Sequence, residues 1–372
     1  MPIGSGAQTL QLLPDVPYVI DPATFMAQTS EQVDKAGLGS YPDPGASNAI
    51  ADSLPDSGIV SALRINFKGT LTVVAGGTQP VPGFNWPYGL IRAFTLSANG
   101  MAHDLWSVNG NDLDALSFVR NPNQQNSSDI FPGAVGGGGS ALGAGTYTLD
   151  LTWDIPIAID EIYLVAALFA QSSQTTIRWK VTRESEANLI APGGTAADWT
   201  IAGTWNVVEH AWEIPIDTHG NLVLPDIRRL HTVVAVDQPF TNTGDVEAPL
   251  LRTAGQMMRL FLSGISATNV PMSALGGTAA ANRIDALRLR YGLHAQPLNF
   301  DPATVLVHEN EQFYGAPVPY DRYVLDFVKR NPARDMVMLQ GITNLRGVVN
   351  VDPAVAPTAG QANIHAVEEI LI

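Results

Sequence analysis

The chain has 372 residues, among them 34 Gly and 26 Pro, with 45% hydrophobic and 15% charged residues and a net charge of −15. This apolar content with non-periodic Gly and Pro excludes a disordered, collagen-like or coiled-coil chain, and the absence of Cys excludes disulfides, thiolate catalysis and Cys-held zinc or iron–sulfur clusters. Residues 1–216 carry 8 basic and 20 acidic side chains against 12 and 15 in residues 217–372, and this acidic surface disfavours direct binding to nucleic acid or anionic lipid.

The length predicts two domains, preceded by an extended N-terminal arm over residues 1–55, which are rich in Pro, Gly, Ala and Ser. The first residues show neither the charged start nor the apolar stretch of a secretory signal, so we expect none. Within the arm, Asp21 is expected to cap a short helix from Pro22 to Val33, because proline is favoured at the first helical position.

From Gly58 onward, alternation of apolar and polar residues predicts strands with one buried face. The clearest runs are 59–68, 147–153 and 175–181, and further strands are expected at 90–96, 162–170 and 205–214, with Asn99-Gly100 as a turn. The run 162–170 is the longest apolar segment, about half of the roughly 18 residues that cross a bilayer, and predicts a buried strand.

One helix is expected to interrupt these strands. Asn111 is the expected N-cap, Asp112 and Asp114 place acid in the first turn, where the helix dipole favours it, and Asn121-Pro122 ends the helix. The apolar stripe consists of Leu113, Leu116 and Val119.

The same organisation starts again after Pro215. Strands are predicted at 230–236, 258–262, 287–291, 323–327, 337–351 and 364–372, with Arg288 and Arg290 pointing outward. A second helix is expected to be capped by Asp301, opened by Pro302 and ended by Gly315, with Leu306 and Phe313 facing inward.

The order strands, helix, strands therefore occurs twice. The expected helix caps at Asn111 and Asp301 lie 190 residues apart, and the preceding strands, opening near Tyr88 and Ile284, lie 196 apart. About eight short strands per copy is the count of a jelly roll, so we predict an all-β fold of two consecutive eight-stranded jelly rolls, each with one short helix, over residues 56–214 and 215–372. Long loops are expected at 121–145, 184–203 and 266–282.

The layout resembles the double jelly-roll major capsid proteins of tailless icosahedral viruses, especially the tectivirus type of the adenovirus-hexon lineage. In the first half the similar stretches are Gly58-Ile59-Val60, Pro-Tyr-Gly-Leu-Ile-Arg at 87–92, 106–118, 145–156, 163–169 and 175–181. In the second half they are Asp301-Pro302, 322–331 and 343–353, so the resemblance covers residues 56–353.

The resemblance implies a homotrimer whose six jelly rolls form a pseudo-hexagonal capsomer of an icosahedral shell. It implies contacts with neighbouring capsomers and, on the inner face, of the arm with adjacent tiles, penton or minor capsid proteins, or an internal membrane. The expected location is the virion, after assembly in the host cytoplasm.

Several patterns that suggest chemistry have simpler structural explanations. His308-Glu309-Asn310-Glu311 lacks the second His of a zincin motif, and Asn109–Asp114 has its Gly in the wrong place for a calcium loop, so it is better explained by helix capping. Asp150 and Asp154 are four strand residues apart, about 13 Å, which is too far for a glycosidase pair. Gly136–Gly139 lacks the Lys-Ser/Thr of a phosphate loop and is expected to be a surface loop.

The remaining candidate side chains are dispersed. No His lies beside a nucleophilic Ser in a motif, and at least Trp153 and Trp179 are expected in the core. The seven His are His103, His210, His219, His231, His294, His308 and His365, and the seven Trp are Trp86, Trp106, Trp153, Trp179, Trp199, Trp205 and Trp212.

We therefore hypothesise a structural protein, the major capsid protein of a bacterial virus, with no catalytic, metal or cofactor site. Two alternatives stay open. One is a carbohydrate-binding or carbohydrate-cleaving β-sandwich, which requires exposed Trp beside two close carboxylates. The other is a viral spike or receptor-binding protein whose long loops carry specificity.

Overall fold

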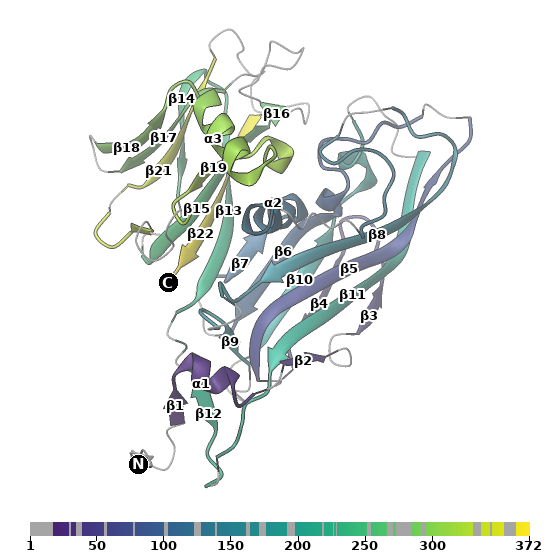
Figure 1. Cartoon of the computed structure of the whole chain (residues 1–372). Helices are drawn as coiled ribbons and strands as arrows, with labels where there is room; N and C mark the ends of the chain where they lie inside the picture. Colours follow the sequence, from purple (N-terminus) through teal and green to yellow (C-terminus); the bar gives the residue numbers. More distant parts are fainter. Residues whose placement is uncertain are drawn as a thin grey trace.

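The computed structural model describes most of the chain as two β-sandwiches side by side (Figure 1). The described residues are 18–29, 31–34, 39–55, 58–76, 79–99, 103–122, 128–137, 140–160, 164–170, 176–191, 198–217, 219–225, 227, 229–250, 254–265, 271–272, 284–291, 295–329, 336–342, 344–352 and 362–372. Within these ranges, no helix has the length and apolar character that crossing a membrane requires.

Among the described residues, three α-helices and three short 3-10 turns accompany the strands. The α-helices are α1 (Pro22–Met26), α2 (Gly110–Arg120) and α3 (Thr304–Tyr314), and the 3-10 turns are η1 (Tyr88–Leu90), η2 (Glu186–Asn188) and η4 (Pro319–Asp321).

The first sandwich packs a six-stranded sheet against the early strands of a ten-stranded sheet. The six-stranded sheet runs β2 (Glu31–Asp34), β11 (Trp199–Trp212), β5 (Ile59–Val73) and β8 (Gly145–Pro156), with β3 (Ser40–Pro42) on β11 and β9 (Leu168–Phe169) on β5. The facing strands are β4 (Ala49–Ser53), β10 (Ile177–Arg183), β6 (Ile91–Ala98) and β7 (Trp106–Val108). Period-two burial places Phe67, Trp153 and Trp205 from one sheet against Phe94 and Trp179 from the other.

The second sandwich packs a four-stranded sheet against the later strands of the ten-stranded sheet. The four strands run β14 (Gly244–Pro249), β21 (Arg346–Val351), β17 (Ile284–Tyr291) and β18 (Ala295–Phe300). The facing strands are β13 (His231–Phe240), β22 (Ala362–Leu371), β15 (Gln256–Ile265), β16 (Pro271–Met272), β19 (Tyr323–Asp326) and β20 (Val337–Met338). Leu260, Leu262 and Ile364 meet Leu287 and Val349 in this core.

The ten-stranded sheet is continuous between the sandwiches, because β7 of the first half pairs in parallel with β13 of the second. Strand β22 lies between β13 and β15, and nine of its ten residues are buried. Such burial on both faces is expected where one face meets the four-stranded sheet and the other meets α2. The first core accordingly contains side chains of the second half, namely Val233, Phe261, Tyr314, Val318, Tyr320, Val324 and Val367.

The described residues between 18 and 53 of the arm are added to this framework. Strands β2 and β3 pair with β11, and β4 pairs with β10, while β1 (Tyr18–Ile20) pairs in parallel with β12 (Val223–Pro225). Phe25 of α1 is fully buried in a small cluster with Ile59 and Leu164.

A glycine pair lets the two longest strands approach each other. Gly69 of β5 lies opposite Gly203 of β11, and the ring of Phe67 lies over both. A Cβ on Gly203 would meet the carbonyl oxygen of Lys68 and would lie 2.7 Å from a Phe67 ring carbon. Only glycine fits at both positions.

The structure corrects three of the predicted helix boundaries. Asp21 does cap α1, accepting from the backbone N–H of Thr24 at 3.0 Å, but the helix ends at Met26 because residues 31–34 pair with β11 as a strand. The N-cap of α2 is Asn109 and not Asn111; Asn109 and Asp112 form a reciprocal capping box, while the buried Asn111 amide donates to Asn85.

The second helix begins at Thr304, two residues after the expected start, because the Asp301 carboxylate faces the Arg288 guanidinium at 3.7 Å instead of capping. Leu306 is buried and Gly315 ends the helix at a φ of 79°, as predicted, but Phe313 is 49% exposed and lies beneath the Lys329 ammonium, because Tyr314 takes the inward position.

Two predicted strands are broken. In the run 162–170 only Leu168–Phe169 is a strand, because Leu164 and Ala166 have φ values of 51° and 65°, and residues 161–163 lie outside the described residues. The run 337–351 divides into β20 and β21 around a turn that contains Gly341 at a φ of 82°. The loop expected over 184–203 is shorter, since β11 already begins at Trp199, and most of 266–282 lies outside the described residues.

Candidate functional site

The most elaborate polar structure of the described chain lies where the two sandwiches meet, between α2 and the sheet face formed by β22, β15 and β19. Along this face the strand register aligns three rows of side chains. The first row holds Asp326, Arg259 and Glu369, the second Val324, Phe261 and Val367, and the third Arg322, Ser263 and His365. An apolar row is thus flanked by two charged rows.

The C-terminal end of α2 contacts the first row. Arg120 Nη2 donates to Glu369 Oε1 at 2.6 Å, and Arg259 Nη1 donates to Glu369 Oε2 at 2.9 Å, so one fully buried carboxylate serves two guanidinium groups. Arg259 Nε also donates to Asp326 Oδ2 at 3.1 Å. Burial alone would raise the pKa of Glu369, but the two arginines hold it well below its ordinary value, so Glu369 is ionised.

His231 of β13 completes this end of the junction. Its Nδ1 lies 3.1 Å from the carbonyl oxygens of Pro156 and Ile157, and its Nε2 lies 3.1 Å from Glu369 Oε1 and 3.2 Å from Arg120 Nη2. Burial lowers the pKa of His231, and this effect together with the charge of Arg120 outweighs the Glu369 carboxylate, which would raise the pKa. The ring is therefore neutral at pH 7.

The N-terminal end of α2 contacts the third row with the opposite charge. The Asp112 carboxylate, whose side chain is fully buried, lies 2.5 Å from Arg322 Nη2 and 3.0 Å from His365 Nε2, and His365 Nδ1 lies 2.6 Å from Asp237 Oδ1. Burial alone would lower the pKa of His365, but the Asp112 and Asp237 carboxylates raise it to about 9. His365 is therefore a cation at neutral pH.

The spacing of the charged residues on α2 matches the spacing of their partners on β22. Eight helical residues separate Asp112 from Arg120, about 12 Å, and four strand residues separate His365 from Glu369, about 13 Å. The signs also agree with the helix dipole, since the carboxylate lies in the first turn and the guanidinium in the last. Reversing the helix along β22 would place like charges together, so the charged rows specify one orientation of the sandwiches.

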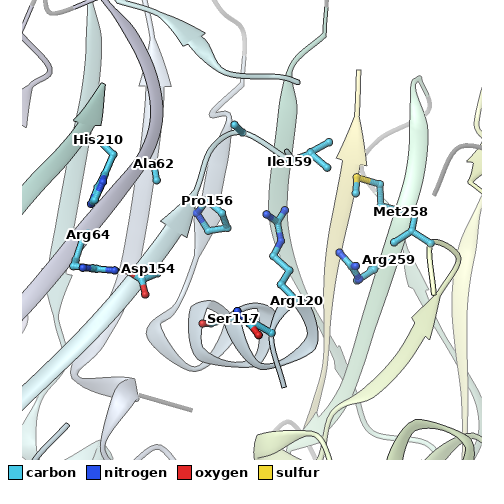
Figure 2. A pocket seen from close by; sticks show the side chains of 13 residues that line it. Ala62, Arg64, Ser117, Arg120, Asp154, Pro156, Ile159, His210, Met258 and Arg259 are labelled. Atoms are coloured by element: carbon cyan, nitrogen blue, oxygen red, sulfur yellow. The ribbon is translucent and has the colours of Figure 1, made fainter. Parts of the chain in front are cut away.

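A cleft of about 650 Å³ opens beside the first row, between the sandwiches (Figure 2). One wall carries Arg64 and Asp154, which form an ion pair at 2.6 Å, and the other carries Met258 and Arg259. Figure 2 shows Ser117 on α2 and His210 on β11 with their side chains apart, so these two lining residues do not form a nucleophile–base pair.

The candidate chemical motifs are separated by the fold. His308 is exposed, with its Nδ1 3.4 Å from Glu311 Oε2, and no cluster of three metal-binding side chains occurs among the residues that the structure describes. Asp150 accepts from Asn66 and Asp154 from Arg64 on the outer face of the six-stranded sheet. Gly136 donates to the carbonyl oxygen of Trp86, and residues 138–139 of the glycine run lie outside the described residues.

The Trp residues do not form a sugar-binding platform. All except Trp212 are buried at 2% exposure or less, and Trp212 is half-buried. The exposed aromatic groove that a carbohydrate-binding function requires is therefore not built from them. Sequence reasoning missed the junction residues, because Asp112, His231 and His365 meet their partners across more than a hundred residues, and no local spacing signals such contacts.

Comparison with known proteins identifies the fold. No protein-family model matches the sequence, and no curated protein matches it. Among solved structures, the major capsid protein of Sulfolobus turreted icosahedral virus is 15% identical with a TM-score of 0.65, covering 92% of this chain and 96% of that chain. The PBCV-1 virus capsid protein is 11% identical with a TM-score of 0.59, covering 92% and 94%. The major capsid protein P2 of bacteriophage PM2 is 14% identical with a TM-score of 0.50, covering 92% and 98%.

Proposed function

We propose a function that follows from the double jelly-roll fold, which the chain shares with these viral capsid proteins and which the sequence layout predicted. We propose that it is itself a major capsid protein, the building block of the icosahedral shell of a tailless virus, with a structural and not a catalytic role. The observation that carries this proposal is that one fold spans nearly the full length of both chains, 92% of this one and 96% of the capsid protein from Sulfolobus turreted icosahedral virus.

The junction supports the same function. A shell subunit must hold its two jelly rolls at one angle so that the lateral surfaces of neighbours match. Two buried charged rows and an apolar row fix α2 on β22, and a continuous sheet joins the halves. Such coupling suits a rigid tile better than a pair of independently moving binding modules.

We propose a homotrimer as the assembling unit, which forms pseudo-hexagonal capsomers and contacts neighbouring capsomers within the virion. The first jelly roll is proposed to span residues 56–214 and the second 215–372, with residues 1–55 as an arm toward the shell interior, where minor capsid or penton proteins or a membrane are its proposed partners. Assembly is proposed to take place in the host cytoplasm.

The test is the mass and shape of the purified particle. Sedimentation velocity with light scattering is expected to give a species of three chains, and negative-stain images are expected to show pseudo-hexagonal outlines. A protein that stays monomeric from micromolar to millimolar concentration would refute the capsid proposal.

A further inference from the structure

One sheet face carries basic side chains that form no ion pair with the described residues. Residues 1–216 have few cations, and most of the described ones are paired: Arg64 with Asp154, Lys68 with Asp150, Arg120 with Glu369 and Arg183 with Asp43. The exceptions are Arg92, Arg178 and Lys180, which are exposed and have no carboxylate within ion-pair distance in the described part of the chain.

Arg92 lies on β6, and Arg178 and Lys180 lie on β10, two neighbouring strands of the first sandwich (Figure 1). Arg178 and Lys180 alternate with the buried Ile177, Trp179 and Val181, so they face away from the core. The register places Lys180 between Ala51 and Thr95, and Arg178 between Ser53 and Ser97. We call the surface formed by these six residues the β4–β10–β6 face. Trp179, between the two cations in sequence, points to the core and is 1% exposed.

The β4–β10–β6 face is hollowed, because the cations stand among short side chains. A depression of about 440 Å³ is lined by Ala51, Ser53, Thr95 and Ser97 with Arg178 and Lys180 at its side. The lining includes one carboxylate, that of Asp52, which already accepts from the Tyr41 hydroxyl at 2.8 Å. The hollow therefore offers cationic donors and hydroxyl groups to an acidic occupant.

The net charge of the chain identifies that occupant. The whole protein carries −15, so the surface of any second copy is acidic on average and complements this basic face. The face cannot pair with itself across a two-fold axis, because Arg178 and Lys180 would meet their own copies. A contact that joins the face to a different surface is heterologous, and a heterologous contact closes into a ring when its rotation permits.

We propose that the β4–β10–β6 face is a lateral assembly contact that receives an acidic surface of a second copy of this chain. This inference rests on the proposed capsid function and names the surface through which the ring forms. The contact is electrostatic in character, so it weakens with salt, since the Debye length falls from about 10 Å at 0.1 M to about 3 Å at 1 M ionic strength.

The experiment compares two double charge reversals in the full-length protein. Arg178→Glu with Lys180→Glu changes the proposed contact, and Arg64→Glu with Lys68→Glu is the matched control, since it gives the same net charge and lies on exposed strand positions of the opposite sheet. Sedimentation velocity gives the dissociation constant of the oligomer, and circular dichroism verifies that each variant is folded.

We expect the face variant to raise the dissociation constant at least 100-fold, because like charges would meet at the contact, and the control to change it less than about fivefold. If Arg178→Glu with Lys180→Glu still assembled with the dissociation constant of the wild type, the inference would be overturned and the capsid proposal would stand. Equal loss in both variants would also overturn it, since net charge alone would then explain the effect.

Two further outcomes separate the remaining possibilities. If the wild-type protein does not assemble at any concentration, the capsid proposal and this contact both fail. If the wild type binds duplex DNA at 0.15 M salt through Arg178 and Lys180 while its self-association is indifferent to their reversal, the occupant is a nucleic acid and the inference is wrong.

Discussion

Glu369 offers the sharpest test of the junction, because its carboxylate can be neutralised without changing its shape. In Glu369→Gln, the Arg120 and Arg259 guanidinium groups lose the anion that faces them at 2.6 and 2.9 Å, and one of them meets an amide N–H instead. The side chain is fully buried, so water cannot replace the lost acceptor.

The expected cost is about 3–5 kcal/mol of unfolding free energy, the range for breaking a buried ion pair by removing one partner. An independent route gives a similar figure, since two hydrogen bonds to charged groups contribute about 1.5–3 kcal/mol each. The matched control is Glu247→Gln. Glu247 also bridges two arginines, Arg290 and Arg346, but its side chain is 30% exposed, and we expect a loss of about 1 kcal/mol or less.

Urea denaturation followed by two probes measures both stability and coupling. All seven Trp lie between residues 86 and 212, so Trp fluorescence reports the first sandwich alone, while far-UV circular dichroism reports both. In the wild type the two transitions should coincide, and in Glu369→Gln they should separate. If Glu369→Gln costs no more than Glu247→Gln and the transitions stay coincident, the charged rows do not couple the sandwiches.

Three further changes test other parts of the structure. The pKa of His365 is raised from 6.5 to about 9, so protonated His365 contributes about 3 kcal/mol to the free energy of unfolding, which is fully present below pH 6.5 and is lost as the pH rises through 9. The urea midpoint should therefore fall less between pH 6 and pH 9.5 in His365→Gln than in the wild type or in the exposed control His308→Gln. Equal falls would contradict this. Burial and the nearby Asp129 charge raise the pKa of Asp114 to about 7, so ionisation of Asp114 destabilises the fold as the pH rises from about 4 through 7. In urea denaturation, Asp114→Asn should be more stable than the wild type at pH 8, by at most about 4 kcal/mol, and equal to it below about pH 4. Equal stability at pH 8 would disprove the raised pKa of Asp114. Gly203→Ala should lower the free energy of unfolding by about 1–3 kcal/mol in thermal or urea unfolding, because the new methyl group meets the Lys68 carbonyl. Gly143→Ala should lower it much less, because a methyl group there meets only the Tyr147 hydroxyl, at 3.8 Å. Similar losses in both variants would mean that the two strands separate to accommodate the methyl group at position 203.

The strands could be predicted from the sequence and the junction could not, for one physical reason. Alternation in 59–68 and 147–153 reports burial of one sheet face, which is a local property of each strand. Apolar sequence does not predict a strand where residues are buried in another conformation. In 162–170, apolar residues enter a core although Leu164 and Ala166 have left-handed backbone conformations. A helix cap depends on which side chain accepts from the backbone N–H groups of the first turn. Asn109 and not Asn111 is the cap, because Asn109 lies three residues before Asp112 and the two form a capping box.

The junction is a property of tertiary register. Asp112 and His365 meet because β22 lies beside α2, which no spacing in the chain announces. The net charge of −15 predicted an acidic surface, and the alternation in 175–181 placed Arg178 and Lys180 on one face of a strand. Only the pairing of β10 with β4 and β6 shows the short side chains that leave a hollow beside them.

The place of β22 has a consequence for biosynthesis. This strand follows every other described element in the chain, yet it separates β13 from β15 in the middle of the largest sheet. While the ribosome is still making residues 362–371, both neighbours present open edges, and such edges invite pairing with other nascent chains. The second sandwich therefore cannot be completed before β22 is available, and a chaperone that shields those edges until then would raise the yield of folded protein.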